Sequence, residues 1–553
     1  MKKNLFTCFL ALLCLAGSAA LSQVVQSPRA DLLHRFGGPT VSLHSGDTHR
    51  GGIARPDTFP PGTLYIEVTH AEGVDSLSLR FWEHLVSERM NVTPGQPLRR
   101  ATLEGNMFEG NRNFRVAEIP FPSAESFGYF NVSYGRNRLI RQWIYFPQDR
   151  VRIRGDLSSG FLLFGGPDGD FYRLQHEVDR VFKEEEFNTD PILFSPDAEF
   201  YRSDSVSERL WNQSRIRPED LFVQMRLITD AESAWGEVES YISSSWQDHP
   251  AMAILDRYSG LLASGRLDLV EAAIKGQVLA TGIKKAELAW PAIRQDPSKL
   301  AGLREWVETF GLKGQEFSHP LLVQAYYQYA LMESHATQVP IEQVYAPLPN
   351  PLREEVIAFY ILDNFNRMED RLPSVISQNL PLVESDWIRQ RFDGLLSNAG
   401  GQFSSDGIYL PDGSQLSPPM LEGKTVLIHF WISGCRFCLE EHQRVMAQLS
   451  ERYRGSEDIL VLTVNADASP ESWKQSLATG KYTSESALNA WGPRGTGILE
   501  SYSIYSYPQK MIISKDGTVR LQTILRMEPE ELIRRLEQDA APDAALLNLP
   551  NPY

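Results

Sequence analysis

The chain has 553 residues, a formal net charge of −16 at pH 7, and 42% hydrophobic against 22% charged residues. This length exceeds what one hydrophobic core supports, so we expect roughly two to four domains, and the composition is that of a folded protein. The acidic balance argues against nucleic acid or an anionic membrane as a partner, because both bind basic patches.

Residues 1–22 have the pattern of a secretory signal peptide. Two lysines precede an apolar run, Leu5 to Leu15, and small residues lead from there to a candidate cleavage site after Ser22. The run is shorter than the ~18–20 residues that span a bilayer, so an uncleaved anchor is disfavoured. Lipidation at Cys14 is also disfavoured, because a leucine and not a small residue precedes it. The pattern predicts export to the periplasm or cell envelope, with no transmembrane segment in the mature chain.

The region after the signal divides into a leader and a β-domain. Residues 23–60 are rich in glycine, proline, serine and aspartate, and we expect a loose leader. Residues 61–160 are expected to form an antiparallel β-domain, because segments of alternating apolar and polar residues are separated by turn-rich stretches. These segments are Leu64–Val68, Leu77–Phe81, Phe127–Tyr134 and Val151–Ile153.

Helical spacing then replaces strand spacing. Residues 161–396 are expected to form an all-α region, punctuated by prolines and without a clean repeat period. Residues 397–406 have the glycine- and serine-rich composition of a linker. Residues 541–553 are expected to be a frayed tail.

Residues 407–540 alternate between strand and helix patterns, which predicts an α/β fold. Two apolar runs in this region are unbroken, as is typical of strands buried on both faces. The expected elements are a strand at Thr425–Trp431, a helix at Cys438–Tyr453, a strand at Ile459–Val464, a hairpin of Lys510–Ile513 and Thr518–Leu521, and a last helix after Glu528.

The chain has four cysteines, and Cys8 and Cys14 would leave with the signal peptide. The remaining pair, Cys435-Arg-Phe-Cys438, lies between the first buried strand and the helix that follows. A bridge across two residues removes little chain entropy, so the pair indicates chemistry and not a structural staple. A helix N-terminus stabilises the thiolate that attacks disulfides, and Arg436 adds a positive charge beside Cys435.

Two other uses of this cysteine pair are disfavoured. A zinc site needs four ligands, and His442 could add only one to the pair. Haem attachment needs a histidine directly after the motif, where Leu439 stands. The sequence therefore predicts no metal and no cofactor.

The motifs support a family resemblance. The sequence GKTVLIHFWISGCRFCLEE from Gly423 to Glu441 resembles the TlpA/ResA-like branch of thioredoxin-fold disulfide reductases. The later segment Tyr505–Gly517 is similar to the cis-proline, strand and Asp-Gly turn of that family. This resemblance covers about a quarter of the chain. A weaker one, carried by Ile144–Gly155, links the β-domain to those ahead of thioredoxin domains in exported TlpA-like proteins.

The resemblance implies roles for individual residues. Cys435 would be the attacking thiol and Cys438 the buried resolving thiol, with the Tyr507–Pro508 bond cis and facing the pair. Glu441 would tune or relay the proton of Cys438; the alternative is a solvated helix residue. The side chains expected to contact the substrate are Trp431, Arg436, Phe437 and Tyr507.

Three residues depart from the family pattern. Gly434 replaces a tryptophan, and Gln443 stands where many relatives have a helix-kinking proline. His429 occupies the strand position at which thioredoxins bury an acid. It could relay protons, but a hydrogen-bonded core histidine is the favoured interpretation.

The resulting functional hypothesis is an exported thiol–disulfide oxidoreductase that reduces protein disulfides and draws electrons from a membrane or envelope donor. The reductase direction comes from the resemblance alone, so an oxidase or isomerase remains an alternative. Another class of function is an envelope binding or scaffold protein in which the thioredoxin-like domain has a supporting role.

Overall fold

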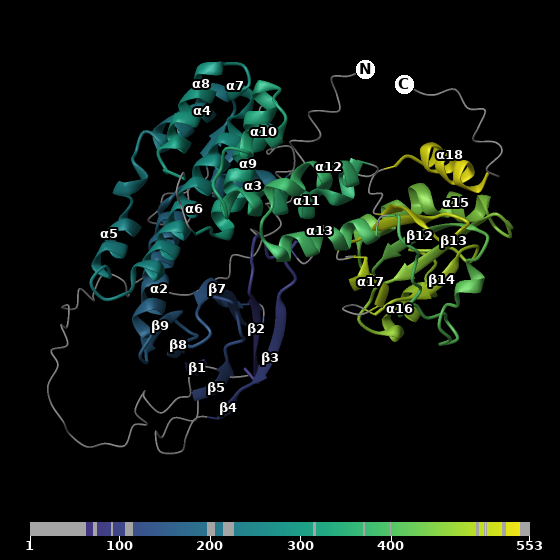
Figure 1. Cartoon of the computed structure of the whole chain (residues 1–553), viewed down its shortest axis with the longest axis horizontal. Coiled ribbons are helices and arrows are strands. Elements are labelled where there is room, and N and C mark those ends of the chain that lie inside the picture. The colour runs from purple at the N-terminus through teal and green to yellow at the C-terminus, as the bar shows by residue number, and fades with distance from the viewer. Residues whose placement is uncertain are drawn as a thin grey trace. The chain divides into compact units, whose positions relative to one another are not determined.

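The computed structural model describes residues 62–541, apart from the segments 70–73, 90–91, 105–113, 136, 196–198, 200–204, 214–225, 313–316, 369–370, 399, 494–496, 503, 505 and 523–526. The predicted signal peptide and leader, and the tail beyond Ala541, lie outside the described residues. Along the chain, the described part has β-sheets first, then a helical middle, then a mixed α/β sheet (Figure 1).

The N-terminal region contains two sheets, with strand orders β4-β5-β1-β8-β9 and β3-β2-β6-β7. Each predicted alternating segment forms a strand, and its apolar residues supply the buried face. The strands are β1 (Thr63–Thr69), β2 (Ser76–Trp82), β3 (Gln96–Ala101), β4 (Leu103–Glu104), β5 (Phe114–Pro120), β6 (Gly128–Tyr134), β7 (Asn137–Tyr145), β8 (Arg150–Asp156) and β9 (Phe161–Gly165).

The prediction of a wholly antiparallel β-domain is wrong for one strand pair. Strands β1 and β8 run parallel, with Thr63 opposite Arg150 and Thr69 opposite Asp156. A parallel pair needs a long crossover connection, and the chain between β1 and β8 provides one by passing through the second sheet. The first sheet also continues to Gly165, because β9 pairs antiparallel with β8.

The middle of the chain is helical. Prolines stand at the first turn of several helices, where a missing N–H leaves no hydrogen bond unmade. The helices are α2 (Gly169–Asn188), α3 (Ser205–Gln213), α4 (Ala231–Ile242), α5 (Pro250–Arg257), α6 (Ser264–Leu288), α7 (Trp290–Ile293), α8 (Pro297–Glu308), α9 (Pro320–Thr337), α10 (Ile341–Tyr345), α11 (Leu352–Met368), α12 (Leu372–Asn379) and α13 (Asp386–Asn398).

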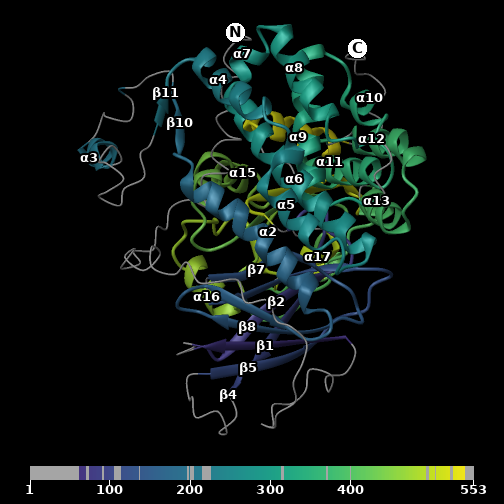
Figure 2. The same cartoon turned by 90° about the vertical axis from the view of Figure 1, so that its left-hand side faces the viewer.

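Helices α6 and α9 lie side by side in both views (Figures 1 and 2). Gly276 permits this close approach, since a Cβ atom at this position would lie 2.5 Å from the backbone nitrogen of Leu322. The region is not all-α as predicted, because β10 (Ile192–Phe194) and β11 (Arg226–Ile228) form a parallel pair. Three-residue strands are too short to show a period in the sequence.

The C-terminal region has a five-stranded sheet in the order β14-β13-β12-β15-β16. The first three strands in this order are parallel to each other, and β15 and β16 are antiparallel to their neighbours. The strands are β12 (Thr425–Trp431), β13 (Ile459–Asn465), β14 (Leu488–Trp491), β15 (Gln509–Ile513) and β16 (Val519–Gln522), and the helices are α14 (Arg436–Glu441), α15 (Ala447–Arg452), α16 (Pro470–Leu477), α17 (Gly497–Ser501) and α18 (Pro529–Ala540).

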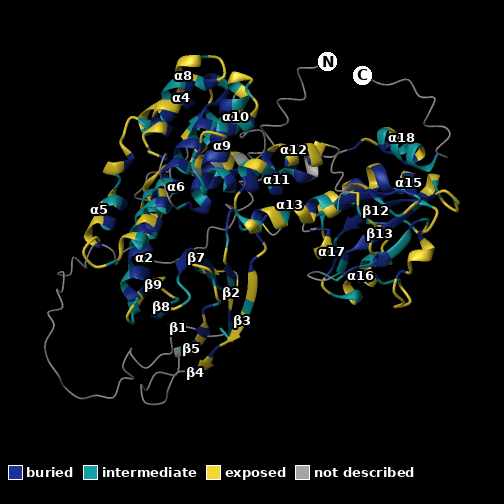
Figure 3. Cartoon of the chain, viewed as in Figure 1, coloured by how far each residue is buried: buried dark blue, intermediate teal, exposed yellow. Residues whose placement is uncertain are grey.

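Every residue of β12 is buried (Figure 3), which confirms the prediction of a strand covered on both faces. Val426, Ile428 and Phe430 pack with α17 on one side. Leu427 packs with α15 and α18 on the other side, and Trp431 packs there with Cys438 of α14 and Trp473 of α16. Part of the predicted linker is attached to this sheet. The backbones of residues 400, 401 and 403 form hydrogen bonds with the backbones of residues 517 and 519.

The helix predicted over Cys438–Tyr453 contains an irregularity at the position of Gln443. Residues His442–Met446 form a π-helical stretch between α14 and α15. π-Turns inside α-helices are frequent at functional sites and change the direction of the helix axis. This chain therefore interrupts the helix without the proline that many relatives place there. Among the described residues, no helix is both long and apolar enough to cross a membrane.

Candidate redox site

The two cysteines lie where β12 leads through a short loop into α14. Cys435 is the N-cap residue of α14, and its Sγ accepts a hydrogen bond from the backbone N–H of Cys438 at 3.0 Å. The two residues form a disulfide with their Cα atoms 5.2 Å apart. Cys435 is half-buried and Cys438 is fully buried, so an incoming thiol or disulfide can reach only the outer sulfur.

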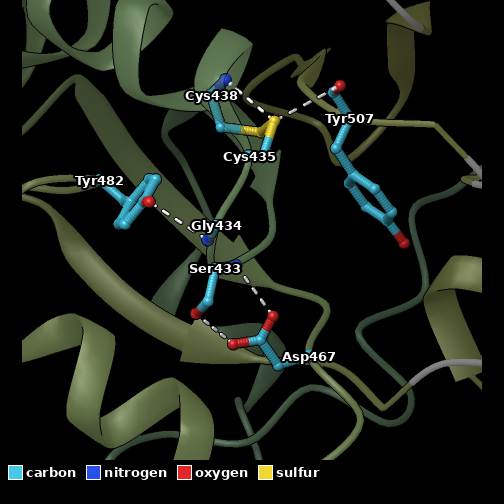
Figure 4. The surroundings of a disulfide bond; sticks show 7 residues. All are labelled: Ser433, Gly434, Cys435, Cys438, Asp467, Tyr482 and Tyr507. Carbon is cyan, nitrogen blue, oxygen red and sulfur yellow. Dashed lines mark hydrogen bonds between the residues drawn. A yellow bond between two sulfur atoms is a disulfide. The ribbon is translucent and has the colours of Figure 1, made fainter. Parts of the chain in front are cut away.

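The loop between Trp431 and Cys435 is held by residues that follow β13 and α16 (Figure 4). The carboxylate of Asp467 accepts hydrogen bonds from the backbone N–H of Ser433, at 2.9 Å, and from its hydroxyl. The hydroxyl of Tyr482 accepts a bond from the N–H of Gly434 at 3.1 Å. These bonds fix the loop that presents Cys435.

Gly434 has a backbone φ of +77°, in the left-handed region. A side chain at this angle is strained, so the glycine suits the turn and the tryptophan of the family pattern would not. Sequence reasoning missed Asp467 and Tyr482. For Asp467 a signal existed: it comes shortly after the second buried strand, and the carboxyl ends of parallel neighbours meet at one sheet edge.

On the other side of the pair, Tyr507 lies beside the disulfide (Figure 4). The Tyr507–Pro508 peptide bond is cis, as the resemblance implies. The carbonyl oxygen of Tyr507 is 3.8 Å from Sγ of Cys435, and both Tyr507 and Pro508 are partly exposed. A substrate bound to Cys435 would therefore meet the main chain of this segment.

The residues expected to contact the substrate divide into two groups. Phe437 is 69% exposed, and the Arg436 side chain is 84% exposed. Trp431 is fully buried, with its ring stacked on Tyr482 at 5.3 Å between centroids. The expectation that Trp431 contacts the substrate is therefore wrong, because the side chain has no surface to offer.

Glu441 is buried and does not stand in solvent. Its carboxylate pairs with the ammonium group of Lys510 and, at 3.4 Å, with the guanidinium group of Arg444. Lys510 is itself 1% exposed. Sequence reasoning missed this lysine because it is the second residue of β15, before the apolar residues of the strand, where a charged residue gives no periodic signal.

His429 is fully buried, and neither ring nitrogen has a hydrogen-bond partner in the described part of the chain. The interpretation as a hydrogen-bonded core histidine is therefore wrong. Burial, with smaller effects from Lys510 and His442, lowers the pKa of His429 to about 3. The imidazole is neutral at physiological pH, because a charge would have no compensation there.

The described residues contain no cluster of His, Cys, Asp or Glu that could hold a metal ion. The chemistry available at the site is that of a sulfur pair at a helix N-terminus. The outer sulfur is accessible, the inner one is enclosed, and the two are close enough to bond. This arrangement can exchange a disulfide with a second molecule.

No protein-family model matches the chain. The sequence is 27% identical over 130 residues to the thioredoxin-like protein YneN of Bacillus subtilis, which covers 23% of this chain and 72% of that protein. It is 26% identical over 121 residues to the thiol-disulfide oxidoreductase ResA of Bacillus cereus, covering 22% of this chain and 66% of the relative.

Among solved structures, a putative thiol:disulfide interchange protein DsbE from Chlorobium tepidum aligns with a TM-score of 0.23 and 23% identity, covering 26% of this chain and 96% of that one. The thioredoxin domain of an oxidoreductase from Bacteroides vulgatus aligns with a TM-score of 0.21 and 19% identity, covering 26% and 99%. Over about a quarter of its length, the chain is therefore similar to thioredoxin-like proteins of the TlpA/ResA type.

Proposed function

We propose that the protein is an exported thiol–disulfide oxidoreductase that reduces protein disulfides through Cys435 and Cys438. One observation carries the proposal: a partly exposed sulfur caps a helix and is bonded to a fully buried second sulfur. The helix N-terminus and the N–H of Cys438 stabilise a thiolate at Cys435 once the pair is reduced.

The reaction then takes two steps. The Cys435 thiolate attacks one sulfur of the substrate disulfide; a bond between Cys435 and that sulfur forms and the other substrate sulfur leaves as a thiolate. Cys438 loses its proton and attacks Cys435, which releases the second substrate thiolate and forms the Cys435–Cys438 disulfide. Two electrons pass to the substrate, and a membrane or envelope donor must return two to the pair.

The remaining residues have supporting roles in this proposal. Arg436, Phe437 and Tyr507 contact the substrate polypeptide, with Pro508 shaping the segment that faces Cys435. Glu441, one turn after Cys438, influences the proton of the second thiol.

Export is supported by the N-terminal sequence pattern. Cell fractionation and sequencing of the mature N-terminus test whether the protein is exported. A start at Gln23 is expected, and an unprocessed cytoplasmic chain would contradict export.

Trapping tests the activity. A Cys438→Ser variant keeps the attacking thiol but cannot resolve the mixed disulfide, so it should accumulate substrates bound through Cys435. The matched control, Cys435→Ser, keeps only the enclosed thiol and should trap nothing. If neither variant traps a protein and the wild type does not reduce insulin, the proposal is wrong and a binding or scaffold role takes its place.

The direction of transfer is tested by equilibrating the pair with glutathione or dithiothreitol buffers. A reductase should have a potential near that of thioredoxin, about −270 mV, whereas strong oxidants lie near −120 mV. A value close to the latter would support an oxidase or isomerase.

A further inference from the structure

A lysine is enclosed beneath the redox helix, and neither exchange step described above uses it. Lys510 lies on β15, two residues after Pro508, and directly opposite His429 of β12. Its neighbour two positions on, Ile512, packs in the core formed with α15 and α18, so Lys510 is on the face that carries α14 and α15. Only 1% of the residue is exposed.

The ammonium group of Lys510 pairs with Oε1 of Glu441, while Oε2 of Glu441 lies 3.4 Å from Arg444. Glu441 is one helical turn after Cys438 on α14. The ion pair therefore joins the helix that carries both cysteines to the strand that follows Tyr507 and Pro508. These are the two elements that meet at Cys435.

The charges around Lys510 come from every element packed against it. Glu441 and Arg444 act on it from the helix, and Glu528 acts on it from the residue before α18. His429 lies opposite on β12, and His442 acts on His429. Burial lowers the pKa of Lys510 and Glu441 opposes this, so the pairing is what keeps an ammonium group in this position. Without the lysine, a carboxylate enclosed one turn from Cys438 would keep only the half-exposed Arg444 as its counter-charge.

A negative charge close to a thiol disfavours its thiolate. The resolving step needs that thiolate at Cys438, because a thiol does not attack a disulfide. Lys510 cancels the charge of Glu441 where Cys438 must lose its proton. The partnership also explains how the chain tolerates an acid at this depth.

We propose that Lys510 is a positioning residue of the exchange reaction, which holds and neutralises Glu441 so that Cys438 can resolve the mixed disulfide. The inference rests on the proposed function of the pair. In this proposal, the negative charge of Glu441 near Cys438 is neutralised by a residue outside the Cys-x-x-Cys motif.

The test separates the two steps with 5,5′-dithiobis(2-nitrobenzoate), in a full chain whose Cys8 and Cys14 are replaced by serine and whose Cys435–Cys438 pair is first reduced with dithiothreitol, which is then removed. Attack by Cys435 releases a first coloured thiolate, and resolution by Cys438 releases a second. Lys510→Met should slow the second phase about tenfold at pH 7 and move its pH profile up by about one unit. The first phase should stay within about twofold, since Cys435 relies on the helix N-terminus.

Three variants complete the design. Lys510→Met combined with Glu441→Gln should have a faster second phase than Lys510→Met alone, because it removes both charges together. Lys510→Arg, which keeps the charge, should remain close to wild type. The matched control is Lys515→Met, since Lys515 pairs with Asp458 at the surface of the same domain and should change neither phase.

The outcomes distinguish the inference from the proposed function. Two normal phases at every pH in Lys510→Met overturn the role of Lys510 and leave the oxidoreductase proposal standing. If Lys510→Met fails to fold, Lys510→Gln takes its place: its second phase should be slowed in the same way, and a second phase at the wild-type rate overturns the inference. If the wild-type pair does not react with the reagent at all, the proposed function itself is refuted.

Discussion

The enclosed histidine of β12 makes a prediction about acid stability. His429 has a pKa of about 3 in the folded protein, against an ordinary value of 6.5. Between pH 6.5 and pH 3, His429 is therefore protonated in the unfolded chain and neutral in the folded chain. Stability from this difference is fully present above pH 6.5 and is lost as the pH falls towards 3.

The magnitude follows from the two pKa values. Between pH 7 and pH 5 the unfolded state gains about 2 kcal/mol from protonation of this one residue, and the slope approaches about 1.4 kcal/mol per pH unit. His429→Leu removes the titrating ring and its unpartnered nitrogens. Between pH 7 and pH 5 the free energy of unfolding of His429→Leu should therefore fall by about 2 kcal/mol less than that of the wild type. At pH 8 the variant should be no less stable than the wild type.

The assay is a urea titration at pH 5, 7 and 8, read by hydrogen–deuterium exchange of peptides that contain β12, so that unfolding of this sheet alone is scored. His442, whose pKa burial also lowers, is present in both proteins, and its contribution cancels in the difference. Equal losses of stability in wild type and His429→Leu between pH 7 and pH 5 would refute the reasoning.

Two further predictions concern the loop that presents Cys435. Asp467→Ala removes the acceptor of both Ser433 hydrogen bonds, so the unfolding free energy of the sheet should fall by about 1–3 kcal/mol and the Ser433 amide should exchange faster; unchanged exchange would contradict the role of Asp467. Gly434→Ala should cost about 1 kcal/mol, because its φ is +77° although no atom lies within 4 Å of the added Cβ. The matched control is Gly302→Ala inside α8, where the added Cβ also meets no atom and the change should stabilise by about 0.5–1 kcal/mol; equal effects at the two glycines would remove the argument from backbone strain.

The central part of the α/β fold could be predicted because its signals are local. The unbroken apolar runs at Thr425–Trp431 and Ile459–Val464 become β12 and β13, and the Asp-Gly turn becomes the hairpin of β15 and β16. The cysteine motif marks the start of a helix, and Cys435 caps it. Each of these features depends on neighbours within a few residues.

The features that escaped prediction depend on partners distant in sequence. The parallel pairing of β1 with β8 follows from the order in which the chain passes through the two sheets, and the sequence of neither strand indicates it. Lys510 is a polar residue within an apolar run, and its importance appears only when the helix α14 lies against it. For Asp467 the position after β13 was a signal, but its partner Ser433 is known only from the fold. His429 escaped for the opposite reason: the sequence located it in the strand, but the absence of a partner is a property of the packed core.

The charges near Cys435 bear on the direction of transfer. Arg436 was expected to stabilise the thiolate, but its side chain is 84% exposed and pairs with Glu440 at 2.7 Å. A screened and paired surface charge contributes little. The thiolate then relies on the helix N-terminus and on the N–H of Cys438. Strong oxidants owe their high potential to a strongly stabilised reduced form, and the paired, exposed Arg436 supplies no argument for such stabilisation here.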